Sequence, residues 1–137
     1  MVIFLFFIFI CMIFKFNANN INNNYKNNLT ITKKNVILGV ILNYDWEIIA
    51  PFFISFKKVS FNNCDCVMFV ENITQESINR IESFNVKIIK IQRTIKARII
   101  NYRHKLYEEF LRNNTDKYNI VLSIDVRDSF FQKDIFK

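Results

Sequence analysis

Four mainly apolar segments of strand length follow one another after residue 35. They are Val36–Leu42, Cys66–Val70, Val86–Ile91 and Ile120–Ile124. A strand covered on both faces is a continuous apolar run, whereas a strand with one wet face alternates apolar and polar residues. The unbroken run Val36–Leu42 therefore predicts a parallel strand that is covered on both faces, and the other three segments predict further strands.

Amphipathic segments lie between these runs. The segment Thr74–Phe84 turns Ile78 and Ile81 inward, and Pro51 lies either in the first turn of the preceding helix or at a kink in it. That preceding helix carries apolar residues at helical spacing, namely Ile48, Ile49, Phe52, Phe53, Phe56 and Val59. A third helix has one apolar stripe, formed by Ile95, Ile99, Tyr102, Leu106 and Phe110. The alternation of strand and helix predicts an α/β fold, with a mostly parallel sheet and flanking helices.

The chain begins with an uninterrupted apolar run, Val2–Phe14, followed by Lys15. As a helix it would span roughly 20 Å at about 1.5 Å per residue, which is short of the ~30 Å hydrocarbon core of a bilayer. This length favours a secretory signal, although Phe16-Asn17-Ala18 is a poor cleavage site. We predict a signal anchor or signal peptide over residues 1–16. The alternative is a cytosolic protein in which the run is a buried strand or helix.

Residues 17–34 follow as an Asn-rich stem, which cannot bury apolar surface. Three glycosylation sequons begin at Asn28, Asn72 and Asn113, all outside the predicted strands. Together with the leader they predict a glycoprotein held by its N-terminal segment in a secretory-pathway membrane, in the Golgi or the ER. Its folded domain, residues 35–137, would then lie in the lumen.

Composition excludes two common ways of binding phosphate. The 137 residues include a single glycine, Gly39. The dinucleotide fingerprint and the P-loop each need several glycines, because backbone amides must approach the phosphate closely. If this chain binds a diphosphate, a metal ion or basic side chains must neutralise it.

The net charge of +7 is concentrated between Lys87 and Arg112, where eight basic residues stand against Glu108 and Glu109. Nucleic acid binds to patches of this kind. Here, however, the basic residues alternate with apolar ones along a strand and surround a helix, as solvated faces do. We therefore predict no nucleic-acid partner.

The histidine and the cysteines give little sign of a metal site. His104 has no partner at ligand spacing, so we expect it on the surface of the third helix. Cys64 and Cys66 lead into a strand, and no second pair completes a zinc site. We predict buried, unpaired thiols.

The segment that we expect to carry the chemistry directly follows the last predicted strand. Ile120–Ile124 stops at Asp125-Val126-Arg127-Asp128, and the chain continues as Ser129-Phe130-Phe131-Gln132-Lys133-Asp134-Ile135-Phe136. In open α/β sheets ligands bind outside the carboxyl ends of the strands, so charged side chains released there face a crevice. The sequence thus predicts a site at this strand end.

The segment resembles the aspartate motif of GT-A-type glycosyltransferases. More narrowly, it resembles nucleotide-diphospho-sugar transferase-like proteins with the pattern Asp-Val-Arg-Asp, two residues, Phe-Gln, one residue, Asp-Pro-Phe; Ile135 stands where that pattern has proline. The resemblance implies the nucleotide-binding half of a GT-A domain, Rossmann-like and incomplete at the C-terminus, because such domains continue past the motif with the acceptor side and the catalytic base. It also implies a nucleotide-sugar donor and a glycan or protein acceptor, with the catalytic residues unknown.

The resemblance further implies roles for the motif. Asp125 would contact the ribose or the metal, and Asp128 would bind Mn²⁺ or Mg²⁺, hard cations that prefer oxygen ligands. In the commoner Asp-x-Asp form the second acid stands where this chain has Arg127, so Arg127 is the alternative positive charge on the diphosphate. In a purely structural alternative, Asp125 and Asp128 cap the following turn while Arg127 pairs with one of them.

Three more residues are candidates by the same resemblance. Asn43 and Tyr44, after the first strand, would hold the base, with Tyr44 stacking on it, and Arg98 would reach the diphosphate. A plain turn and a solvated helix charge are the respective alternatives. Two other functions stay open at this point: a non-catalytic luminal protein that retains the nucleotide half, and a basic α/β interaction domain.

Overall fold

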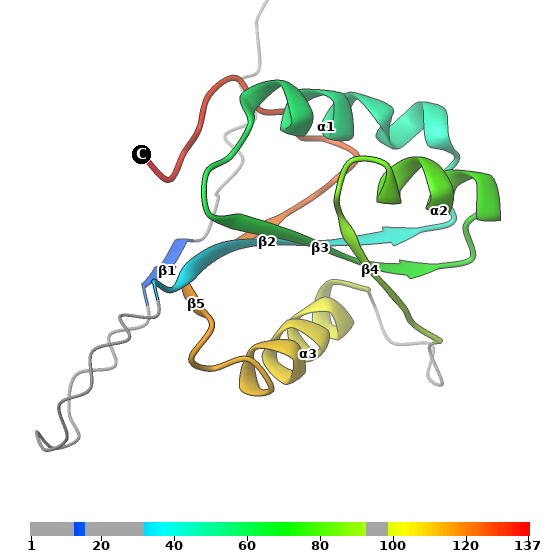
Figure 1. Ribbon diagram of the computed structural model, residues 1–137. Coiled ribbons are helices and arrows are strands. Elements are labelled where there is room, and N and C mark those ends of the chain that lie inside the picture. Colours follow the sequence, from blue (N-terminus) through cyan, green and yellow to red (C-terminus); the bar gives the residue numbers. More distant parts are fainter. Residues whose placement is uncertain (1–12, 16–31, 93–98) are drawn as a thin grey trace, which may run out of the picture.

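The computed structural model describes residues 13–15, 32–92 and 99–137, and these residues form an α/β fold (Figure 1). The elements follow one another as β1 (Ile13–Lys15), β2 (Lys34–Leu42), α1 (Trp46–Val59), β3 (Cys64–Glu71), α2 (Gln75–Glu82), β4 (Lys87–Lys90), α3 (Ile99–Arg112) and β5 (Tyr118–Ile124). All four strands predicted from the apolar runs are present. The predicted fold class is thereby confirmed.

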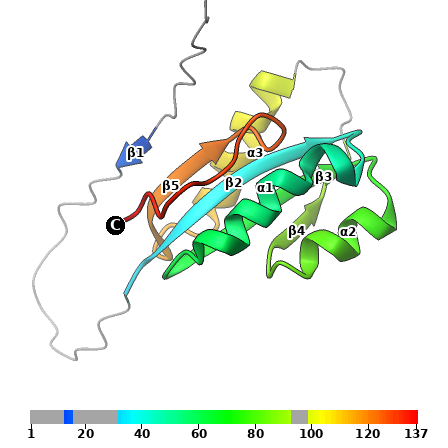
Figure 2. The same cartoon turned by 90° about the horizontal axis from the view of Figure 1, so that it is seen from above.

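The sheet has the strand order β1-β5-β2-β3-β4 (Figure 2). The pairs β2–β3, β3–β4 and β2–β5 are parallel, and only β1 runs antiparallel, on the outer side of β5. The parallel strands therefore lie in the chain order third, second, first, fourth. This is the order of the first four strands of the doubly wound dinucleotide-binding fold, and its direction reverses between β2 and β5.

The helices cover both faces of the sheet. Helices α1 and α2 lie on one face and α3 lies on the other (Figure 1). Side chains of β2 alternate between the two layers, because successive residues of a strand point to opposite faces. Ile37 and Ile41 join the core under α1, whereas Val36 and Leu38 join the core over α3. Strand β2 is thus covered on both faces of the sheet, as its unbroken apolar run predicted.

Helix α1 follows the predicted apolar stripe with two departures. Its residues Ile49, Phe52 and Phe53 are fully buried. Ile48, which the spacing placed with them, is 45% exposed. Pro51 lies inside the helix, in its second turn, so of the two alternatives for this proline the first-turn position is excluded.

Helices α2 and α3 also agree with their predicted patterns. Ile78 and Ile81 of α2 are buried, and Thr74 caps that helix by accepting a hydrogen bond from the backbone N–H of Ser77 at 3.1 Å. In α3, Phe110 is buried as predicted, and Glu108 and Arg112, four residues apart on the helix, form an ion pair at 2.6 Å. Ile95 of the predicted stripe lies outside the described residues.

Three segments are joined at the amino ends of the strands by one carboxylate. Asp65 of β3 accepts hydrogen bonds from Lys34 of β2 and from Tyr118 of β5, both at 2.9 Å, and pairs with Lys117 at 2.8 Å. Burial acts to raise the pKa of Asp65, but the hydrogen bonds from Lys117, Lys34 and Tyr118 lower it to about 2. The cluster therefore fastens the sheet at the edge opposite the predicted site.

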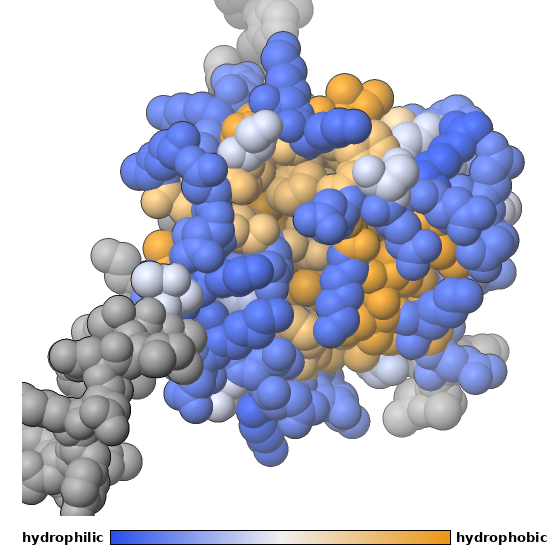
Figure 3. All heavy atoms as spheres, in the orientation of Figure 1, coloured by the Kyte–Doolittle hydropathy of each residue, from blue (hydrophilic) through white to orange (hydrophobic). Residues whose placement is uncertain are grey.

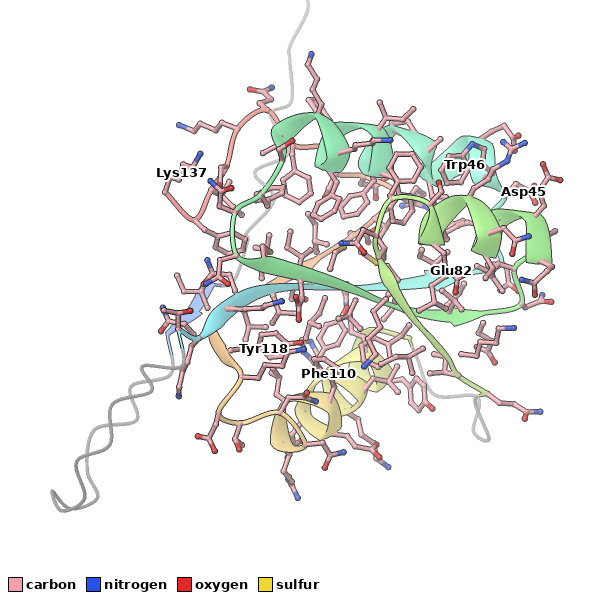
Figure 4. All side chains as sticks on the ribbon, viewed as in Figure 1. Asp45, Trp46, Glu82, Phe110, Tyr118 and Lys137 are labelled. Atoms are coloured by element: carbon pink, nitrogen blue, oxygen red, sulfur yellow. The ribbon has the colours of Figure 1, made fainter. Side chains whose placement is uncertain are left out.

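After β5 the chain runs back over α1 without regular structure. Phe131 donates its backbone N–H to the hydroxyl of Ser55 at 2.9 Å, and its ring lies 5.3 Å from that of Phe52 and 4.8 Å from that of Phe61. Figure 4 shows Asp45 and Trp46 at one end of the sheet and Lys137 at the opposite end. The tail is therefore packed along the whole length of α1.

Some apolar surface stays open in the described part of the chain. Ile54 of α1 is 57% exposed and Phe130 of the tail is 66% exposed. Figure 3 shows apolar atoms reaching the surface among hydrophilic ones. No helix among residues 13–15, 32–92 and 99–137 is long and apolar enough to span a membrane. Residues 1–12 and 16–31 lie outside the described residues, so the leader and the stem stay predictions, although Ile13–Lys15 at the end of the leader form β1.

Candidate functional site

The predicted site lies where the strand order reverses. Strands β2 and β5 are parallel neighbours, with Gly39 paired to Ile124, so both strands end at the same edge of the sheet. The chain continues from the end of β2 into α1, and from the end of β5 into the tail that runs back along α1. A crevice outside the carboxyl ends at such a switch point is the usual ligand site of open α/β sheets. The sequence placed residues 43–45 and 125–128 at strand ends, and the fold brings the two segments together.

Tyr44 and Arg127 make the contact between the two segments. The guanidinium carbon of Arg127 lies 5.9 Å from the centre of the Tyr44 ring, within the range of a cation–π interaction. The ring of Tyr44 also packs against the core under α1. The aromatic side chain is thus held on one side by the core and meets a cation at the sheet edge.

The loop after β5 is closed by local hydrogen bonds. Asp125 accepts the backbone N–H of Arg127 at 3.2 Å. The guanidinium of Arg127 donates to both oxygens of Asp128, from Nε at 2.9 Å and from Nη2 at 2.8 Å. A hydrogen bond from Arg127 lowers the pKa of Asp128, and the same bond raises the pKa of Arg127. This geometry agrees with the structural alternative in the cap by Asp125 and in the pairing of Arg127 with an acid, whereas Asp128 accepts from the Arg127 side chain and not from a backbone N–H. The ligand roles of the three residues stay predictions.

Asn43 is fixed by the end of the neighbouring strand. It has φ 55°, and Asn72, which follows β3, has φ 52°. Asparagine tolerates this left-handed conformation better than most residues. The side-chain amide of Asn72 donates to the side-chain oxygen of Asn43, and the backbone N–H of Asn43 donates to Glu71 at 3.2 Å. Asn43 thus forms the plain turn that was the alternative to a base-binding role. It is exposed at the edge of the sheet where a base would lie.

Gly39 has a role at this site that the sequence interpretation missed. A Cβ at Gly39 would lie 2.7 Å from Cγ2 of Val126 and 2.6 Å from Sδ of Met68. Val126, between Asp125 and Arg127, is 1% exposed. The glycine thus leaves the space that Val126 fills, and Val126 sets the position of the charged residues on either side of it. A glycine inside an otherwise apolar strand was the available signal, because it marks a close approach by a neighbour.

The other candidates lie away from this edge. Arg98 falls outside the described residues. His104 is exposed on α3, as predicted. Both thiols are unpaired; Cys66 is buried as predicted, whereas Cys64 is only half-buried. Burial raises the pKa of the Cys64 thiol to about 12 and raises that of Cys66 well above its usual value. Within residues 13–15, 32–92 and 99–137, no three His, Cys, Asp or Glu side chains gather as metal ligands.

An open groove of about 980 Å³ lies between α1 and the tail. Its walls include the exposed Ile54 and Phe130, with Lys58 and Lys133 beside them. Asp134, which also lines it, accepts the backbone N–H of Phe136 at 2.9 Å and is a local turn residue. The groove contains none of the predicted site residues.

Comparisons of the chain with protein-family models, with curated proteins and with solved structures find no match in any of the three. The fold and the geometry of the sheet edge therefore carry the functional argument by themselves.

Proposed function

We propose that the edge formed by residues 43–45 and 125–128 binds a nucleotide-diphosphate sugar, and that the complete protein transfers the sugar to a glycan or protein acceptor, as GT-A-type glycosyltransferases do. One observation carries the proposal. The strand order reverses between β2 and β5, and there an aromatic ring, a guanidinium and two carboxylates from distant parts of the sequence meet, with Arg127 5.9 Å from Tyr44.

Each of these groups suits one part of such a ligand. The ring of Tyr44 is a stacking surface for a base, and base–aromatic stacking tolerates any base. The carboxylate of Asp125 accepts hydrogen bonds from ribose hydroxyls. Arg127 offers a planar fork of donors that matches phosphate oxygens. Its side chain is 52% exposed, so the guanidinium is accessible to a ligand.

A divalent cation fits the same edge. Asp125 and Asp128 would hold Mn²⁺ or Mg²⁺ together with oxygens of the diphosphate, and the ion would stabilise the charge that develops on the leaving group. Both oxygens of Asp128 accept from Arg127 in the ligand-free structure. Each carboxylate oxygen retains a second lone pair, so Asp128 can bind a metal ion while it still accepts from Arg127.

Calorimetric titration of UDP tests this proposal. Asp125→Asn removes the charge but retains the oxygen that accepts the Arg127 N–H, so the loop should persist while UDP affinity falls by about tenfold or more. Asp116→Asn is the matched control, because it removes an exposed charge from the turn before β5, at the opposite edge of the sheet. Equal affinity of Asp125→Asn and the unchanged chain would refute the site.

Two additional arms separate the open alternatives. Titration in the presence of a chelator, with and without Asp128→Asn, tests the metal: unchanged affinity in both would assign the positive charge to Arg127. A transfer assay with sugar nucleotide tests catalysis, since turnover would exclude the non-catalytic alternative. We also propose that the domain lies in the lumen of the secretory pathway, held to the membrane by the N-terminal segment.

A further inference from the structure

Helix α3 carries two buried hydrogen-bond donors without partners in the described part of the chain. They are Nε of Arg103 and the hydroxyl of Tyr107. The two residues are four apart on a helix, so their side chains lie on the same face, one above the other. Tyr107 is 6% exposed, and its ring lies 5.7 Å from that of Phe69 in β3, so this face is turned toward the sheet.

These donors lie beneath the end of β5. Val121 belongs to the core on the α3 side of the sheet, whereas Leu122 and Ile124 belong to the core on the α1 side. Alternation along the strand therefore directs Ser123 and then Asp125 toward the α3 side. Asp125 thus leaves the strand above the helix face that carries Arg103 and Tyr107.

The electrostatics of Tyr107 agree with this placement. Burial raises its pKa to about 12; Ser123, as a hydrogen-bonding neighbour, and the charge of Arg103 act to lower it, and the charge of Asp125 acts to raise it. The hydroxyl of Ser123 is therefore close enough to act on the phenol, but this contact falls short of hydrogen-bond geometry, and by that geometry the phenol oxygen has no partner in the described residues. All four polar groups gather under the carboxyl end of β5.

Buried donors without acceptors are rare in native proteins, because each loses its hydrogen bonds to water without replacement. Nε of Arg103 can only donate and the hydroxyl of Tyr107 can donate as well as accept, so one acceptor between them would satisfy both atoms. A guanidinium takes anionic oxygens most strongly, and phosphate is the acceptor that matches its fork. The cluster lies at the edge of the sheet where such a ligand is expected.

We propose that Arg103 and Tyr107 bind phosphate oxygens of the nucleotide diphosphate from the α3 side of the sheet edge. This inference rests on the proposed function and extends it. The chain has one glycine, and the Cβ position of that glycine is closed by Val126 and Met68, so no glycine-rich loop can hold the phosphates. Arg127 is already paired with Asp128. Helix α3 supplies the second cation, from the opposite face.

The test compares three ligands by calorimetry: UDP, uridine and inorganic pyrophosphate. Arg103→Gln should weaken UDP and pyrophosphate by about tenfold or more, because a hydrogen bond to a charged group is lost, and should leave uridine unchanged. Tyr107→Phe should weaken UDP by roughly threefold to tenfold, as expected for a neutral donor. Lys105→Gln, an exposed charge on the same helix, is the control and should change UDP affinity less than about twofold.

The outcomes separate this inference from the proposed function. If UDP binds and Arg103→Gln binds it equally well, the phosphate role of Arg103 is wrong while the nucleotide site stands. If pyrophosphate binds through Arg103 and UDP binds no more tightly than pyrophosphate, the phosphate site stands and the nucleotide proposal falls. If neither ligand binds the unchanged chain, both fall.

Thermal melting is recorded for every variant. Lower melting temperatures with unchanged affinities would show that the cluster is structural and satisfied by an internal water, and would overturn the proposal. If Arg103→Gln fails to fold, Arg103→Lys serves instead. Lysine retains the positive charge but lacks the planar set of guanidinium donors. Arg103→Lys should therefore bind UDP more weakly than the unchanged chain and bind uridine with unchanged affinity.

Discussion

Replacing Gly39 with alanine perturbs the candidate site through a single methyl group. The new Cβ would lie 2.7 Å from Cγ2 of Val126 and 2.6 Å from Sδ of Met68, both in the fully packed core. Carbon atoms in contact lie about 3.5–4.0 Å apart, so Val126 must move by about 1 Å. Val126 is stiff at χ1 because it is β-branched, and the backbone of Asp125 and Arg127 therefore moves with it.

The expected magnitude follows from two opposed effects. Overfilling a close-packed core typically costs about 1–3 kcal/mol. Replacing a glycine in extended backbone by alanine stabilises the fold by about 0.5–1 kcal/mol, because the unfolded chain loses freedom. We expect Gly39→Ala to lower the free energy of unfolding by about 1–2 kcal/mol and to weaken UDP by about tenfold through displacement of the charged residues.

Urea unfolding followed by the fluorescence of the single tryptophan, Trp46, measures the stability change. The matched experiment is a double-mutant cycle with Val126→Ala, which removes one of the two clashing groups. We expect Gly39→Ala to cost less in that background, with a coupling of about 1 kcal/mol. Additive effects within about 0.5 kcal/mol would refute the packing argument, as would an unchanged UDP affinity in Gly39→Ala.

Three other predictions concern the frame around the site. Asp65→Asn should lower the free energy of unfolding by about 1–2 kcal/mol at pH 7, because the folded pKa is about 2, below the ordinary value of 3.8. That contribution is present above pH 3.8 and is lost as the pH falls through 2, so the unfolding free energies of the two proteins, measured in urea, should converge in acid. The substitution should leave UDP affinity unchanged. A difference in stability that persists at low pH would contradict the assignment. Thr74→Ala should destabilise the fold by about 1 kcal/mol through loss of the α2 cap, and Thr74→Ser should not; equal stability of the two variants would contradict the capping role. After expression in a eukaryotic secretory host, glycosidase should shift the band of the unchanged protein but not that of a variant with Asn28→Gln, Asn72→Gln and Asn113→Gln, whereas an unmodified protein would contradict the luminal location.

The sequence predicted the elements well because each has its own hydrophobic period. Mainly apolar segments marked β2 to β5, and the motif at residues 125–128 was placed correctly at a strand end. The order of the strands could not be predicted in this way. β5 lies next to β2 because α3 carries the chain across the other face of the sheet, and no local pattern encodes that crossing. The contact of Tyr44 with Arg127 follows from this order.

The remaining differences also have physical causes. The predicted stripe, of which Tyr102, Leu106 and Phe110 are described, covers only part of the buried face of α3, because such a face is wider than one stripe. Tyr107 lies within that wider face and was missed for this reason. The role of Gly39 depends on the register of β2 against β5, which is fixed by tertiary pairing. The pairing of Arg127 with Asp128 depends on a loop conformation that periodicity does not describe.

The position of the bound nucleotide is the most direct test of this account. Hydrogen exchange of the full chain, measured with and without UDP, gives a footprint on the backbone amides. We expect protection at residues 43–45 and 125–128, at the carboxyl ends of β2 and β5, and no change around Asp65 at the opposite edge. Protection confined to the groove between α1 and residues 130–137, or a footprint that is the same in Asp125→Asn, would contradict the assignment of the site to the switch point of the sheet.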